Sequence, residues 1–188
     1  MSPSAISDVR LEAITEAEFE TVAQLGETIW RKHYATIISG AQIDYMLAGR
    51  YTHDELRKYL YAGDRWMELL KFSGKPVGYC SYSLTSTPGE MKLEQLCLLQ
   101  ECQGKGLGGL MLRHVESQAL RHGLSVLMLQ VNKRNVNSIA FYRKAGFTLR
   151  VEAVFDIGGG YFMDDYVMEK TIRAGSANIQ GLSRNDTA

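Results

Sequence analysis

The segment Gln103-Gly104-Lys105-Gly106-Leu107-Gly108-Gly109 stands between an apolar run that ends at Leu99 and an amphipathic run that begins at Leu107. This order predicts a strand, a tight glycine loop and the first turn of a helix. Glycine lets the backbone turn sharply and approach a ligand, and the first N–H groups of a helix lack partners within the helix. The segment is therefore predicted to bind a phosphate-bearing cofactor.

Two other classes of glycine loop do not fit this segment. A P-loop needs a lysine followed by serine or threonine at the helix start, where this chain has Leu107 and Gly108. A dinucleotide-binding loop needs an acidic residue about 20 residues on, at the end of the next strand. Here that strand ends in Gln130-Val131-Asn132. A glycine cluster alone also serves as a helix cap, so its context decides its meaning.

Composition points to one compact intracellular domain. The chain has 188 residues, of which 45% are apolar, enough for a substantial core. Lysine plus arginine (21) equals aspartate plus glutamate (21), so neither nucleic acid nor a membrane surface is an expected partner. The amino terminus lacks a leader pattern, and the expected location is cytoplasmic. The cysteines have no metal-ligand spacing, which predicts reduced thiols and no metal site.

Periodicity and turn signals predict alternating strands and helices. Strands are expected at 9–13, 65–72, 76–84, 91–99, 124–131, 147–156 and 161–170. Helices are expected after a capping box at 15–18, at about 41–47 and 52–60, from 107 to a cap at Gly123, and at 135–145. The central strand-helix-strand unit requires a parallel crossover beside antiparallel hairpins. The predicted fold class is α/β (α+β), with one mixed central sheet flanked by helices on both faces.

The expected domain covers residues 8–170. Residues 1–7 and the small, polar stretch 171–188 lack apolar periodicity, so both are predicted to be flexible. The carboxy-terminal hairpin is expected to leave strand edges exposed, and such edges would allow pairing into a homodimer.

The glycine loop and a second motif together resemble the GNAT superfamily of acyl-coenzyme A dependent N-acetyltransferases. The first motif of that family is Gln or Arg, two residues, Gly, one residue, then Gly or Ala, which residues 103–108 match. In the second, Asn135 is followed seven residues later by Tyr142 and then by Gly146-Phe147, although Ser138 stands where the family usually has alanine. The resemblance covers roughly residues 9–170. It implies direct transfer of an acetyl group from acetyl-coenzyme A to a primary amine.

The resemblance also implies which residues hold the cofactor. Backbone amides would bind the pyrophosphate, from Gln103, Gly104, Lys105, Gly106, Leu107, Gly108 and Gly109. Main-chain groups near Leu96 and Leu98 would pair with the pantetheine arm as a strand does. Asn135 would hold the pantetheine or pyrophosphate portion, and Asn132 and Asn137 compete for that task. For Asn132 and Asn137, helix capping or loop turning is an equally good interpretation.

Two residues are candidates for acid-base catalysis. The Tyr142 hydroxyl would protonate the departing thiolate, unless this tyrosine is only a packed core residue. Glu94 would take the proton of the amine, which is an ammonium at neutral pH. Strict strand alternation predicts that Glu94 shares a face with Leu96 and Leu98. The alternative for Glu94 is a solvent-facing pair with Lys92.

The acceptor region is less well defined by the sequence. Trp30, His33 and Tyr34 are candidate substrate-binding residues, because the family uses its first helices for acceptor selection and aromatic faces suit a cationic amine. The alternative is a helix that simply packs through Trp30. Asp164 and Asp165 occupy adjacent strand positions, so they cannot both line one pocket.

Several acceptors and one different function remain open. The helical first third resembles the branch of the family that acetylates small amines, including polyamines. A protein N-terminus or lysine, an amino acid and an aminoglycoside are alternative acceptors. A noncatalytic acyl-coenzyme A binding or sensing module is the other function. Direct transfer needs no acyl-enzyme, so Cys97 and Cys102 are expected to be packing residues.

Overall fold

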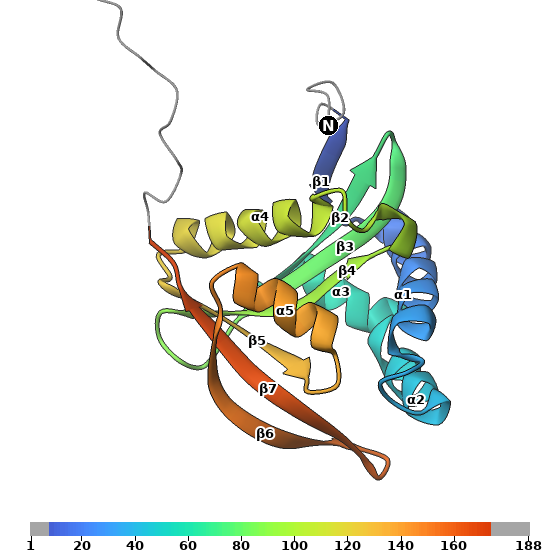
Figure 1. Cartoon of the computed structure of the whole chain (residues 1–188). Helices are drawn as coiled ribbons and strands as arrows, with labels where there is room; N and C mark the ends of the chain where they lie inside the picture. The colour runs from blue at the N-terminus through green and yellow to red at the C-terminus, as the bar shows by residue number, and fades with distance from the viewer. Residues whose placement is uncertain (1–7, 174–188) are drawn as a thin grey trace, which may run out of the picture.

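The computed structural model describes residues 8–173, and its amino-terminal third is mainly helical (Figure 1). This part contains β1 (Val9–Ala13), the 3-10 turn η2 (Glu16–Glu18), α1 (Phe19–Tyr34), α2 (Gly40–Arg50) and α3 (His53–Tyr61). The predicted capping box between Thr15 and Glu18 is present. Side-chain caps also start the next two helices, at Ser39 and Thr52.

The remainder of the described chain alternates strands and helices around the glycine loop. Its elements are β2 (Arg65–Phe72), β3 (Lys75–Leu84), β4 (Glu90–Leu98), η3 (Gln100–Cys102), α4 (Leu107–Arg121), β5 (Val126–Asn132), α5 (Val136–Lys144), β6 (Thr148–Gly158) and β7 (Tyr161–Thr171). These seven strands form one sheet in the order β1-β2-β3-β4-β5-β7-β6. Only β4 and β5 pair in parallel. The predicted mixed sheet is confirmed.

Helices cover both faces of the sheet. One apolar cluster joins sheet residues to α4 and α5 through side chains such as Met111, Val115 and Ile139. The other joins the opposite face to α1 and α3 through Phe19 and Leu56. Figure 1 shows α1, α2 and α3 together on one side of the sheet and α4 and α5 on the other. The sheet is therefore the middle layer between two helical layers.

A bulge interrupts β4 at Glu94. In the β3–β4 register Gln95 pairs with Ser81 and Leu93 pairs with Tyr82, which leaves Glu94 without an opposite residue. A bulge places two consecutive side chains on one face of a strand. Side chains of β4 alternate between the two faces of the sheet, and the bulge shifts this alternation by one residue for the part of the strand that follows it.

The bulge makes the predicted face of Glu94 wrong. The Glu94 carboxylate accepts hydrogen bonds from Tyr59 of α3 and from Ser83, on the amino-terminal helix side. Leu96 and Leu98 pack instead against the cluster that contains α4. Strict alternation puts all three on one face, but the extra residue of the bulge turns Glu94 to the other.

The β4 and β5 strands separate after a short parallel contact. They pair only between Glu90–Leu93 and Val126–Leu129, although β4 continues to Leu98 and β5 to Asn132. Figure 1 shows the two strands diverging beside α5. Among the described strands, the end of β4 therefore has one edge without a partner, and Leu96 and Leu98 of this end line one cavity with residues of the glycine loop.

The last strand runs slightly beyond the expected domain end. β7 extends to Thr171, and the N–H of buried Ile172 donates to the Ser125 carbonyl. The segments 1–7 and 174–188, predicted to be flexible, lie outside the described residues. Across the described residues, no helix combines the length and hydropathy needed to cross a membrane. β6 lies at an edge of the sheet, and the homodimer stays a prediction.

Candidate active site

The glycine loop forms a cradle of unpaired backbone N–H groups. Gly104 and Gly106 have φ angles of 74° and 81°, a region that side-chain-bearing residues rarely adopt. Gly106 is the N-cap of α4. Within residues 8–173, the N–H groups of residues 104–109 donate to no protein acceptor, and the first bond is from Leu110 to Gly106. Such a cradle at a helix N-terminus suits a phosphate or pyrophosphate.

A cavity of about 580 Å³ opens from this loop into the gap between β4 and β5, and we call it the loop cavity. Its lining includes Gln103, Gly104, Gly106, Gly108, Gly109, Leu96, Leu98, Asn135 and Tyr142. The cavity thus brings most of the residues predicted for the cofactor next to the candidate acid. One of its walls is the end of β4, whose unpaired main-chain groups could pair with a chain-like ligand.

Tyr142 presents an unpaired hydroxyl to the loop cavity. Its ring packs edge-on against Phe141 and Phe147. Among the described residues, none forms a hydrogen bond with the hydroxyl. Burial raises the pKa of Tyr142 above its usual value, with smaller contributions from Tyr34 and Cys97. The hydroxyl therefore keeps its proton at neutral pH and can donate it.

Asn135 connects α5 to α1. Its Oδ1 accepts a bond from the Ser138 N–H and so caps α5, while its Nδ2 lies 2.9 Å from His33 Nε2. An amide N–H must donate in this contact, so His33 Nε2 accepts and its ring is neutral. Burial also lowers the pKa of His33. Both residues line the loop cavity, whereas His33 is not part of the aromatic cavity described below.

Three residues predicted for the cofactor do not line the loop cavity. Leu107 is buried in the core below the loop, and the Lys105 ammonium lies over the ring of Phe72. The Asn132 side chain accepts a bond from the Arg134 N–H and so supports a turn. Their backbone or side-chain contacts with a cofactor stay predictions.

A second cavity, of about 780 Å³, lies toward the amino-terminal helices, and we call it the aromatic cavity. Its aromatic lining comes from four elements, with Trp30, Tyr34, Tyr45, Tyr59 and Phe155. Such a wall suits an apolar body or a cationic amine. Trp30 and Tyr34, two of the predicted acceptor residues, belong to it.

The two cavities meet along a shared wall. Trp30, Tyr34, Glu94 and Gln130 line both of them. Tyr59 donates to Glu94 Oε2 at 2.7 Å, and Ser83 donates to Oε1 at 3.0 Å. These bonds fix the carboxylate at the junction. A group held in one cavity therefore lies next to a group held in the other.

The two adjacent aspartates of β7 differ as expected. Asp165 lines the aromatic cavity, is 5% exposed, and has no hydrogen-bond partner at Oδ1 among the described residues. Burial raises the pKa of Asp165 to about 6, which nearby Asn132 and Lys92 counteract in part. Asp164 is exposed and pairs with Lys133 at 2.6 Å. Only Asp165 belongs to the site.

Cys97 also lines the loop cavity, but its surroundings do not activate it. Burial raises the pKa of Cys97 to about 11, although nearby Tyr79 lowers it in part. A thiol needs a lowered pKa to act as a nucleophile at neutral pH. The prediction that this cysteine is not the nucleophile stays consistent with that environment.

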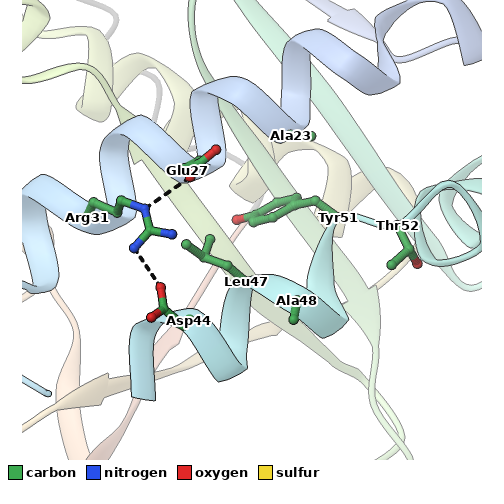
Figure 2. Close-up of a pocket in the computed structure, with 8 residues that line it drawn as sticks. All are labelled: Ala23, Glu27, Arg31, Asp44, Leu47, Ala48, Tyr51 and Thr52. Carbon is green, nitrogen blue, oxygen red and sulfur yellow. Dashed lines mark hydrogen bonds and ion pairs between the residues drawn. The ribbon is translucent and has the colours of Figure 1, made fainter. Parts of the chain in front are cut away.

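A third hollow, between α1 and α2, is a poorer candidate. Figure 2 shows Arg31 reaching from α1 to both Glu27 and Asp44, with Tyr51 and Leu47 projecting into the same space. The Arg31 bonds are 3.1 Å and 2.7 Å long. Because these charges already satisfy one another, the hollow offers a ligand little that is unpaired.

Sequence reasoning missed several residues of the aromatic cavity. Arg50, Tyr59, Lys92 and Gln130 line it, and none had been proposed as a binding group. They come from α2, α3, β4 and β5, so no local spacing links them. The only available signal was Lys92, weighed as a surface partner of Glu94. In the structure its Nζ donates instead to Gln130 Oε1 at 2.9 Å.

Comparison with known proteins gives this arrangement a family. Residues 27–147 match the model of the acetyltransferase (GNAT) family. A spermidine N(1)-acetyltransferase from Thermoplasma acidophilum is 24% identical over 166 residues, covering 86% of this chain and 96% of that protein. A 5-NmdU N-acetyltransferase from Pseudomonas phage PaMx11 is 27% identical over 121 residues, covering 61% and 84%.

Solved structures agree with the family match. The crystal structure of PaiA N-acetyltransferase from Thermoplasma acidophilum in complex with coenzyme A has a TM-score of 0.73. It is 20% identical and covers 87% of this chain and 98% of that one, so it shows a shared fold. The family match spans more than half of the chain and includes the glycine loop and all of α5. The chain therefore belongs to the GNAT family and is an N-acetyltransferase.

Proposed function

We propose that this protein transfers an acetyl group directly from acetyl-coenzyme A to a primary amine, with the thioester in the loop cavity and the amine in the aromatic cavity. The observation that carries this proposal is the shared wall of the two cavities, formed by residues that include Glu94. Direct transfer requires both substrates to lie side by side, without water between them. Two cavities that meet at a carboxylate meet this requirement.

The loop supplies the coenzyme site in this proposal. The unpaired N–H groups of residues 104–109 bind the pyrophosphate, and the free edge of β4 near Leu96 and Leu98 pairs with the pantetheine arm. Asn135 borders the same path while it caps α5. These contacts direct the thioester toward the shared wall.

Glu94 acts as the general base and Tyr142 as the general acid. Glu94 takes one proton from the ammonium, and the free amine then attacks the thioester carbonyl carbon. A C–N bond forms and the C–S bond breaks. Tyr142 gives its proton to the departing sulfur and recovers one from the nitrogen. The net products are the amide, the free thiol and one proton released to solvent.

The acceptor belongs to the small amines in this proposal. The aromatic lining of the cavity suits a cationic amine, and a spermidine acetyltransferase is among the relatives, so polyamines are one class of small amine to test. A protein N-terminus or lysine is the main alternative within the same chemistry.

Release of free thiol from acetyl-coenzyme A tests the proposal. The purified protein is incubated with polyamines, monoamines, amino acids and lysine peptides, and the thiol is followed over time. We expect amine-stimulated release. Tyr142→Phe should lower kcat about 100-fold while the affinity for coenzyme A changes little.

Tyr61→Phe is the matched control, because Tyr61 is 76% exposed and lies outside the candidate site. It should leave turnover unchanged. Binding of coenzyme A without amine-stimulated thiol release across the panel would favour a sensing module. A large loss of coenzyme affinity with unchanged kcat would contradict the acid role of Tyr142.

A further inference from the structure

The aromatic cavity contains charges of both signs. Its charged lining residues are Arg50, Glu55, Arg65, Lys92, Glu94 and Asp165. Two of these already have partners outside the cavity. Glu55 pairs with Lys58 at 2.6 Å, and Arg65 pairs with Asp64 at 3.1 Å. Two cations and two carboxylates are left to meet a ligand.

The two remaining cations lack an acidic partner. Within the described part of the chain, neither Arg50 nor Lys92 forms an ion pair. The guanidinium carbon of Arg50 lies 5.1 Å from the centre of the Trp30 ring, and Lys92 donates one bond to Gln130. An ammonium has three donors and a guanidinium five. Most of these donors are therefore free.

These cations also act on one another. Burial lowers the pKa of Lys92, and Arg50 lowers it further, while Glu94 and Asp165 raise it. All four groups line the same cavity, and the other three act on the Lys92 ammonium. Two cations that line one cavity, and that no acid of the described residues bridges, favour an anion between them.

We infer that the acceptor is an amine that also carries an anionic group, a carboxylate or a phosphate, and that Arg50 and Lys92 bind that group. The inference rests on the proposed function, since it concerns the acceptor of the same transfer. The amine end then faces Glu94 at the wall shared with the loop cavity. A polyamine has no group for the two cations and places further positive charge beside them.

Matched pairs of acceptors test the inference, because each pair differs only in the anionic group. We would compare phenylalanine with phenethylamine, lysine with cadaverine, and phosphoethanolamine with ethanolamine, with spermidine as an added arm. The carboxylated or phosphorylated member should have a kcat/KM about 10- to 100-fold higher, mainly through a lower KM. The first two pairs report a carboxylate and the third a phosphate.

Arg50→Met tests the assigned residue. The variant keeps an apolar stem but loses the charge. The ratio of kcat/KM between the anionic and the other member of each pair should therefore fall at least about 5-fold, because KM for the anionic member rises. Arg31→Met is the matched control, because Arg31 pairs with Glu27 and Asp44 between α1 and α2, outside both cavities. That variant should keep the preference. Lys92→Gln should act in the same direction as Arg50→Met.

The outcomes separate the inference from the proposed function. If amines are turned over but the member without the anionic group, or spermidine, is as good a substrate as the anionic member, the inference alone is overturned. Thiol release by no compound overturns the proposed function. In that case calorimetric titration of the coenzyme A-loaded protein with the same pairs still decides the inference. Tighter binding of the anionic member would support it, and equal or weaker binding of that member would overturn it.

Discussion

The loop cavity and the aromatic cavity are built in different ways. The loop cavity takes its anion-binding donors from the backbone of one short run, residues 104–109. The aromatic cavity takes its charged groups from Arg50 in α2, Lys92 in β4 and Asp165 in β7. A backbone site depends on conformation and tolerates many side chains, whereas a side-chain site changes with each substitution. One fold can therefore keep a coenzyme site while its acceptor varies.

The largest effect of a single substitution is expected at Glu94, where the two cavities meet. Glu94→Gln removes the proposed base without changing the size of the side chain, so kcat near pH 7 should fall about 100- to 1,000-fold. An alkylammonium has a pKa of about 10.4, so the free amine becomes more abundant as pH rises. The deficit of the variant should therefore shrink with rising pH. Thiol release measured from pH 6 to 10 checks this.

Glu20→Gln is the control for that measurement, because Glu20 is exposed on α1, outside both cavities. It should follow the unmodified protein across the pH range. Full turnover of Glu94→Gln at pH 7 would show that Glu94 is not the base and that water or another group takes the proton.

The next test concerns the backbone of the loop cavity. Gly106→Val places a β-branched residue at a φ angle of 81°, although nothing lies within 4 Å of the added Cβ. The strain shifts the N–H groups rather than creating a clash, so affinity for coenzyme A should fall about 10- to 100-fold. Calorimetric titration with coenzyme A measures the loss.

Gly74→Val provides an equal strain in a different place. Gly74 has a φ angle of 72°, also has nothing within 4 Å, and lies in the β2–β3 turn. This variant should bind coenzyme A normally. Equal losses in both variants would mean that Gly106→Val acts through general destabilisation, and the backbone cradle would lose its support.

The loop cavity was predictable because its information is local. The spacing of Gly104, Gly106 and Gly108 after an apolar strand requires a tight turn into a helix, whatever the rest of the chain does. The second motif adds Asn135 and Tyr142, which are seven residues apart and therefore lie about two turns from one another on a helix. Both segments fold as expected, with α4 starting at Leu107 and α5 at Val136.

The aromatic cavity was not predictable, because its geometry depends on pairing between distant elements. The bulge that turns Glu94 toward Tyr59 arises from the β3–β4 register, and the sequence of β4 alone follows simple alternation. Arg50 approaches Trp30 only once α1 and α2 pack together. Asp165 was recognised as one of two adjacent aspartates, but its pattern does not reveal which one is buried.

The smallest expected effect is on the free energy of unfolding, which the ionisation of buried Asp165 in the aromatic cavity lowers. Burial raises the pKa of Asp165 from 3.8 to about 6, so folding disfavours its ionised form. Between about pH 4 and pH 6 the folded protein holds more protons at this site than the unfolded chain. The free energy of unfolding therefore falls as pH rises through this range. Asp165→Asn, which mimics the neutral form, should remove that loss.

The difference in unfolding free energy between Asp165→Asn and the unmodified protein should therefore grow between pH 4 and pH 6 by about 1 to 3 kcal/mol, then stay level. Urea unfolding at pH 4, 5, 6 and 7.5 measures it, and all other titrating groups cancel in the difference. Asp164→Asn changes an exposed, paired neighbour and should show no such growth. A flat difference for Asp165→Asn would mean that this carboxylate ionises in the folded protein as easily as in water. Burying the Asp165 carboxylate would then cost the aromatic cavity no stability, and the two cavities would not differ in this respect.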